Sequence, residues 1–297
     1  MVTRRALALA AAALLCCTAA FAAQTVNSAS GYAQAPNAKV LAQGTVEVSG
    51  AYVRSEGSNE LLKLLPSPCD GNGFNLRASA GVSDRVEVGL GYLGINKDIG
   101  DAHAFTVAGK VSLYQKPESK LAISAGAAYR HWSCDMVAPL PFDGGLDIGL
   151  PSVFSMYLVA DKGWDAVAGS PWSWVTTVGV VYDSYSSSQQ GMGILAAVAA
   201  PEGAVIILDG NTEIPRETFV RPFLAVEASK GDWSVLADFK PRLRKSGFTY
   251  QSEAWSLAVR KTLPNELTVT AGVTNFNLPY TDSNPGVFVD LSYKFNK

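Results

Sequence analysis

A histidine, a serine and an aspartate occupy every second position of a short run, and these residue types could carry out proton-transfer chemistry. In the run His131, Ser133, Asp135, a histidine could accept a proton from serine or water while a carboxylate held it in place. However, alternation places His131 on the same strand face as Ile123 and Tyr129, which is apolar. We therefore expect an interfacial or loop histidine and no catalytic residues, so the sequence does not predict an enzyme.

Other chemical signatures are missing from the sequence. The acids Asp135, Asp143 and Asp147 lack the spacing of an EF-hand loop, and no phosphate-binding GxxxxGK[ST], HExxH or CxxC motif occurs. We expect no cofactor and no metal site. With 24 basic and 26 acidic residues and no basic patch, the chain is not expected to bind nucleic acid.

A larger set of charged residues alternates with apolar ones on strand-like segments. If the apolar positions face outward, the inward face carries eight basic and five acidic side chains: Glu47, Arg77, Glu87, Lys110, Arg130, Arg221, Glu227, Asp238, Lys240, Arg242, Arg260, Asp290 and Lys294. One interpretation is a polar lumen that filters solutes by charge, with a slight preference for anions. The alternative is an internal ion-pair network, because charges inside a barrel need partners or water.

These positions lie on segments with the two-residue alternation of β-strands and no sustained helical period. Twelve segments qualify: 44–54, 74–83, 86–96, 104–114, 121–132, 152–161, 173–183, 218–228, 233–243, 250–260, 267–277 and 286–295. Each is about ten residues long, the length of a tilted transmembrane strand and longer than most soluble strands.

The connections alternate in length, which indicates a transmembrane barrel. Every second connection is long or irregular, namely 55–73, 97–103, 133–151, 184–217, 244–249 and 278–285. The connections between them are mostly tight turns, of which 162–172 is the longest. Short periplasmic turns and longer outer loops are typical of outer-membrane barrels. We predict an all-β fold, an antiparallel up-and-down transmembrane barrel of about twelve strands. A soluble secreted sandwich or lipocalin-like barrel is the alternative.

Aromatic residues gather towards the ends of these segments, among them Trp132, Trp174 and Trp233. This clustering favours an aromatic girdle at the two membrane interfaces, although aromatics are also common in any β-strand.

The first 23 residues have the features of a secretory signal peptide, with Arg4 and Arg5 before an apolar run and Ala20-Phe21-Ala22 at the cleavage site. The predicted organisation is a signal peptide at 1–23, an N-terminal periplasmic segment at 24–43 and the barrel at 44–297. After cleavage Cys69 and Cys134 remain, and export to an oxidising compartment favours a disulfide between them over two free thiols.

The most apolar stretch of the mature chain, residues 192–208, is MGILAAVAAPEGAVIIL. Pro201 and Gly203 interrupt it, so we do not expect a spanning helix. A hairpin or short helix in an outer loop keeps the strand count at twelve, whereas two further wall strands would raise it to fourteen.

Two motifs resemble bacterial outer-membrane barrels, including transporter and porin-like families. The run from Gly81 to Tyr92 (GVSDRVEVGLGY) resembles their strand–tight turn–strand unit. The C-terminal VFVDLSYKF resembles the last-strand signal for the barrel assembly machinery, with Val289, Leu291, Tyr293 and Phe295 as the alternating positions, although Asn296 and Lys297 follow the final aromatic residue here.

The resemblance implies export to the Gram-negative outer membrane, contact with lipid and lipopolysaccharide, and the assembly machinery as a partner during biogenesis. The function expected is a narrow channel or passive transporter for small hydrophilic solutes. A sealed structural or envelope-assembly barrel is the alternative, and a hydrolase at the barrel rim is the least favoured.

Overall fold

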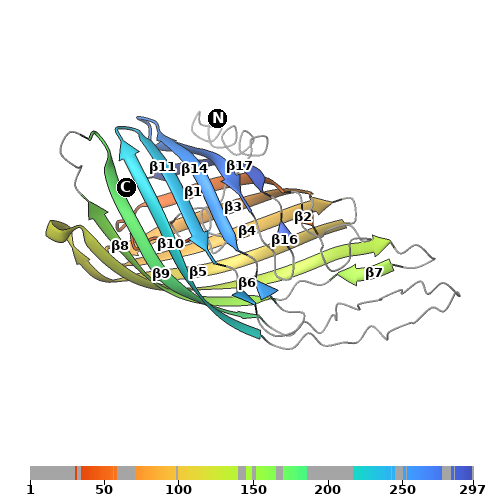
Figure 1. Cartoon of the computed structure of the whole chain (residues 1–297). Coiled ribbons are helices and arrows are strands. Elements are labelled where there is room, and N and C mark those ends of the chain that lie inside the picture. Colours follow the sequence, from red (N-terminus) through yellow and green to blue (C-terminus); the bar gives the residue numbers. More distant parts are fainter. Residues whose placement is uncertain are drawn as a thin grey trace, which may run out of the picture.

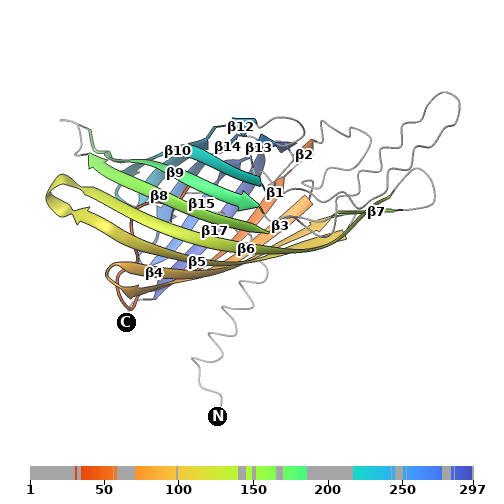
Figure 2. The ribbon, with the colours of Figure 1, turned by 90° about the horizontal axis from the view of Figure 1, so that it is seen from below.

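The computed structural model describes residues 31, 35–55, 57–58, 71–97, 100–139, 145–148, 152–164, 170–185, 217–241, 243–244, 250–251, 253–275, 282–283 and 285–295. These residues form a closed antiparallel β-barrel with twelve strands in its wall (Figures 1 and 2). The predicted fold class is therefore confirmed.

The twelve wall strands follow one another around the barrel in chain order. They are β1 (Val46–Ser55), β3 (Gly71–Ser83), β4 (Val86–Lys97), β5 (Gly100–Lys116), β6 (Leu121–Pro139), β8 (Val153–Trp164), β9 (Ser173–Tyr185), β10 (Glu217–Lys230), β11 (Trp233–Lys240), β14 (Ala254–Thr262), β15 (Leu267–Thr274) and β17 (Gly286–Phe295). Each wall strand pairs with its sequence neighbour, and β1 pairs with β17, so the barrel has up-and-down topology.

The tight connections gather at one end of the barrel, to the left in Figure 1. They include the turn at Asp84 and Arg85 and the 3-10 helix η1 (Pro117–Ser119), and β1 begins and β17 ends at the same side. We call this the turn end and the opposite side the loop end. The even strand number places both ends of the wall on the turn side.

Several strands extend further at the loop end than the sequence predicted. The connection expected at 97–103 is mostly strand, because β4 continues to Lys97 and β5 begins at Gly100. β6 runs to Pro139 and pairs there with β7 (Gly145–Ile148). Pairing of this kind outside a bilayer needs no apolar outer face, which explains why hydrophobic alternation did not reveal it.

Other short pairs lie at the loop end. β2 (Gly57–Ser58) pairs with β16 (Asp282–Ser283), and β12 (Leu243–Arg244) pairs with β13 (Tyr250–Gln251). β12 lies at the end of the predicted strand 233–243, and β13 lies at the start of the predicted strand 250–260. The continuous ladder between these two predicted strands ends where Lys240 pairs with Ala254.

The strand number is twelve and not fourteen. β9 and β10 pair directly along their whole length, from Ser173 with Ser229 to Tyr185 with Glu217. No strand can therefore be inserted in the wall between them. The residues of the stretch 192–208 themselves lie outside the described residues.

Apolar side chains face outward and polar ones face the interior. On β4, Leu90 is 61% exposed whereas Glu87 is 1% exposed, and the same alternation recurs around the wall. A continuous apolar outer surface is what a bilayer covers and what a soluble barrel avoids. Among the described residues no helix has the length and apolar character needed to cross a membrane.

Aromatic side chains mark the turn end of this outer surface. Trp164, Trp174 and Trp233 are all exposed there, and Lys162 and Lys261 place their ammonium groups 5.4 and 4.7 Å from the rings of Trp164 and Trp233. Amphipathic rings beside cations suit a membrane interface.

Trp132, which the sequence assigned to the girdle, is only 5% exposed and lies on the interior face. Arg130, on the same face, has its guanidinium 6.0 Å from the ring of Trp132. The strand therefore turns this ring away from the membrane interface.

Candidate solute path through the barrel lumen

The described residues directly before β1 lie inside the barrel at the turn end. We call residues 35–45 the lumen segment. Ala35 and Ala38 are 0% and 2% exposed, and Leu41 is buried as well. The sequence predicted a periplasmic segment at 24–43. In its described part from residue 35 onward, polar side chains of the interior wall bind the backbone, and the periplasmic side stays a prediction.

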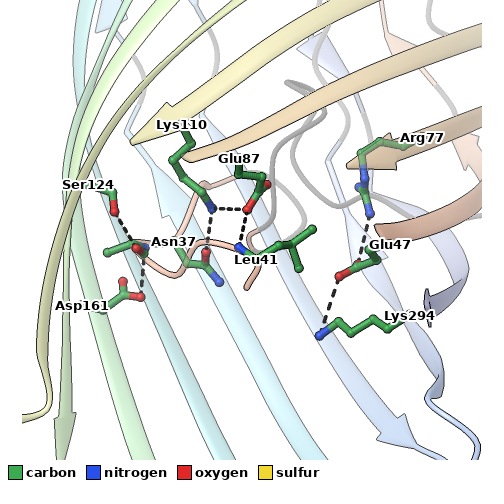
Figure 3. Close-up of polar contacts among 10 residues, drawn as sticks. Asn37, Leu41, Glu47, Arg77, Glu87, Lys110, Ser124, Asp161 and Lys294 are labelled. Atoms are coloured by element: carbon green, nitrogen blue, oxygen red, sulfur yellow. Dashed lines mark hydrogen bonds and ion pairs between the residues drawn. The ribbon is translucent and has the colours of Figure 1, made fainter. Parts of the chain in front are cut away.

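The first pair of contacts comes from β4 and β5. The backbone N–H of Leu41 donates to Oε2 of Glu87 at 3.0 Å. The same Glu87 oxygen lies 3.4 Å from Nζ of Lys110, which also donates to Oδ1 of Asn37 at 3.4 Å. Both wall side chains are almost fully buried, and Figure 3 shows them turned towards the lumen segment.

The second pair of contacts comes from β6 and β8. Ser124 donates through Oγ to the carbonyl oxygen of Ala38 at 2.5 Å, and the N–H of Ala38 donates to Oδ2 of Asp161 at 2.9 Å. The other Asp161 oxygen accepts from Oγ1 of Thr177 at 2.7 Å. Four adjacent strands thus each contribute one polar side chain to the lumen segment.

Two glycines allow the segment to enter the barrel. Gly44 has a φ of 79°, a left-handed conformation that favours glycine, within a turn closed by the N–H of Thr45 donating to Ala42 O at 3.0 Å. A Cβ at Gly81 on β3 would lie 2.5 Å from the carbonyl oxygen of Leu41 and closer still to that of Ala42. Gly81 therefore leaves the space through which the backbone passes.

A second group of charges lines the opposite wall at the turn end. Glu47 lies 3.7 Å from both the Arg77 guanidinium and the Lys294 ammonium group. The charges of Asp290 and Arg260 also act on Arg77. Within the described part of the chain the three guanidinium nitrogens of Arg77 have no hydrogen-bond partner, although Arg77 is 4% exposed.

A third group of charges lies nearer the loop end. Asp183 on β9 accepts from Ser155 Oγ at 2.6 Å and from Arg221 Nη2 at 3.3 Å. Asp238 on β11 accepts from Ser256 Oγ at 2.5 Å, and Lys240 lies on the same interior face. The interior is therefore packed with charged side chains towards both ends of the wall.

The predicted lumen residues fall on the interior face wherever the structure describes them. Eight are buried, namely Glu47, Arg77, Glu87, Lys110, Arg221, Asp238, Lys240 and Asp290, and four are half-buried, namely Arg130, Glu227, Arg260 and Lys294. Arg242 lies outside the described residues. The structure gives the positions of these side chains. Their role in the selectivity of a channel stays a prediction.

Two acidic residues of the interior were missed from the sequence. Asp161 and Asp183 are 4% and 6% exposed on the interior face. Each is the last residue of its predicted strand, and the alternation through Ser155 and Tyr157 places Asp161 inward. With these two added, seven acidic and seven basic side chains occupy the described interior, so this part of the lumen has no excess of basic groups.

The histidine run lies on β6 towards the loop end. His131 is exposed on the outer face, and its Nδ1 lies 2.9 Å from Ser152 Oγ. Ser133 is exposed, and the side chain of Asp135 lies outside the described residues. No group of three metal-ligating side chains occurs in the described parts of the chain.

The cysteine side chains lie outside the described residues, whereas the last strand lies within them. Cys69 and the side chain of Cys134 lie outside the described residues, so the disulfide stays a prediction. The last strand presents Val289 and Phe295 outward and closes the barrel by pairing with β1, where Val46 lies opposite Phe295. Its recognition by the assembly machinery also stays a prediction.

Comparison with known proteins shows similarity of fold without similarity of sequence. No protein-family model matches, and no curated protein matches significantly. The COG4313 outer membrane channel from Pseudomonas putida F1 superposes with a TM-score of 0.52 at 11% identity, covering 88% of this chain and 99% of that one.

Two further solved structures are the β domain of the Bordetella autotransporter Brka and the translocator domain of the autotransporter NalP from Neisseria meningitidis. Each has a TM-score of 0.48, at 11% and 12% identity, covering 84% and 86% of this chain and 98% and 90% of the other. With its closed wall of twelve strands and its apolar outer face, the chain has the fold of the bacterial outer-membrane β-barrels.

Proposed function

We propose that the protein is an outer-membrane channel that passes small hydrophilic solutes through a narrow lumen, without covalent chemistry. The observation that carries the proposal is the interior face, which bears charged side chains from Glu47 and Arg77 at the turn end to Asp183 and Arg221 near the loop end. Interior charges suit a hydrated path, and an outer-membrane channel shares the fold.

The lumen supports small solutes only. Eight strands leave an interior filled by side chains, and 16–18 strands leave an open channel, so twelve strands lie between these limits. The buried interior charges, such as Arg77, Glu87 and Asp290, are exposed by only a few per cent, which means that a wide aqueous path does not run beside them. The equal numbers of acidic and basic side chains predict weak discrimination between anions and cations.

A sealed barrel is the second candidate, favoured by the close ion pairs Lys110–Glu87 at 3.4 Å and Arg221–Asp183 at 3.3 Å. Paired charges of this kind can hold an occluded barrel together. In that case the protein would serve as a structural component of the outer membrane, to which it is exported by its signal peptide and assembled among lipid and lipopolysaccharide.

Single-channel recording in planar bilayers separates the two candidates. The expected result is a small conductance whose reversal potential in a KCl gradient lies near zero. Lys240→Gln removes one interior cation and should shift the reversal potential towards cation selectivity. Glu118→Gln, in the exposed turn beside Lys116, changes one charge at the surface and should leave it unchanged. No conductance from folded protein would support the sealed barrel.

A further inference from the structure

We propose that the lumen segment, residues 35–45, is a gate that closes the turn end of the lumen and opens by leaving its wall contacts. This inference rests on the proposed channel function and specifies how that channel is regulated. The segment lies inside the barrel and is bound to β4, β5, β6 and β8 (Figure 3).

The hydrogen bonds that join the segment to the wall are polar contacts that water could also make. Leu41 and Ala38 donate backbone N–H groups to the carboxylates of Glu87 and Asp161, and Ala38 accepts from Ser124. Water can replace each of these hydrogen bonds when the segment leaves, whereas a large apolar interface could not be exchanged in this way.

The wall keeps partners for its charges after the segment leaves. Glu87 retains the Lys110 ammonium group at 3.4 Å, and Asp161 retains the hydroxyl of Thr177 at 2.7 Å. Release therefore leaves neither carboxylate without a partner in the wall. The carboxylates of Glu87 and Asp161 have hydrogen-bond or ion-pair partners in the docked and in the released arrangement. A gate requires two such arrangements.

A pivot for the movement lies at the rim. The turn from Ala42 to Thr45 joins the segment to β1, with Gly44 in the left-handed conformation. Gln43 donates its N–H to Asp84 at 3.3 Å in the exposed turn between β3 and β4. Residues 35–41 can therefore leave the interior while β1, which closes the barrel against β17, stays in place.

The experiment uses the full chain with two kinds of change. Deletion of residues 35–43 removes the gate and leaves β1 complete. The double substitution Glu87→Gln/Asp161→Asn weakens the two carboxylate contacts without shortening the chain. Glu118→Gln is the control, because it removes an exposed carboxylate at the same end of the barrel. Folding is checked for each variant by heat-modifiable migration on gels.

Two readouts are needed, single-channel conductance and amide exchange of peptides from residues 35–45. We expect the deletion to increase the open probability or conductance at least fivefold, the double variant to increase both opening and exchange of the segment, and the control to match the wild type. Equal non-zero conductance in the wild type, the deletion and the double variant would overturn the gate and leave the channel standing.

Absence of conductance in every folded variant would overturn the channel itself, and the gate with it. Faster amide exchange in the double variant without any change in its conductance would likewise contradict the gate, because the segment would then leave the wall without opening a path.

Discussion

Gly81→Ala should release the lumen segment while leaving the wall intact. The added Cβ would lie 2.5 Å from the carbonyl oxygen of Leu41 and 2.7 Å from the carbonyl carbon of Ala42, and closer still to the Ala42 oxygen. Gly81 is held in β3 by the ladders to β1 and β4, whereas the segment is joined to the wall by separate hydrogen bonds to side chains. The segment should therefore move, and not the strand.

The expected magnitude follows from the hydrogen bonds near this position. Moving the backbone strains or breaks the bonds from Gly44 N–H to Gly81 O and from Gly81 N–H to Thr45 O, each 2.9 Å, and withdraws the Leu41 N–H from Glu87. A neutral hydrogen bond contributes about 1 kcal/mol net and one to a charged group about 2 kcal/mol, so the docked state loses about 2 to 4 kcal/mol. At tenfold for each ~1.4 kcal/mol, the released fraction rises roughly 30- to 1,000-fold.

Amide hydrogen exchange with mass spectrometry measures this release in peptides from residues 35–43, since exchange follows the open population when closing is fast. Gly109→Ala is the matched control, because its Cβ would meet only the Glu87 carbonyl oxygen, at 3.9 Å. If amide exchange rises less than threefold in Gly81→Ala, or rises equally in both variants, the added Cβ does not release the segment from the wall.

Three further predictions test the wall, the interior and assembly. Leu90→Arg, on the outer face, should lower the unfolding free energy in lipid by about 2 to 4 kcal/mol, whereas Leu113→Arg, nearer the turn-end interface, should cost about 1 kcal/mol or less in urea titrations. Asp183→Asn should destabilise the barrel by about 3 kcal/mol in the same titrations by leaving Arg221 uncompensated, and adding Arg221→Met should restore part of this. Phe295→Ala should reduce the amount of folded barrel in outer-membrane fractions without changing total synthesis, and an unchanged folded fraction would contradict its role in assembly.

The wall could be predicted from the sequence because it solves one simple physical problem. Each strand must present apolar groups to lipid and polar groups to the interior, and this leaves a two-residue alternation such as Glu87 against Leu90. Beyond the bilayer that requirement ends, so the extension of β6 to Pro139 left no pattern to detect. The choice between twelve and fourteen strands also needed the observed pairing of β9 with β10.

The lumen segment could not be predicted, because three of its hydrogen bonds to the wall use the backbone. Ala38 and Leu41 bind through N–H and C=O groups that every residue other than proline possesses, so their side chains carry no signal. Asp161 and Asp183 were different, because strand parity already placed them inward. Gly81 carried a weaker signal, since a small inward residue beside β1 leaves room for another chain.

The chemistry of this interface bears on whether the segment is a permanent plug or a reversible one. A plug held by large apolar side chains would lose about 25 cal/mol for each Å² of surface returned to water, with no compensating contact. Here the backbone of Ala38 and Leu41 binds two carboxylates and a hydroxyl, and hydration replaces such hydrogen bonds at a net cost of about 1 to 2 kcal/mol each. Because the Glu87–Lys110 pair persists in either arrangement, the wall does not have to reorganise. An interior of paired charges thus accommodates either the segment or water, and this favours a reversible gate over a fixed structural filling.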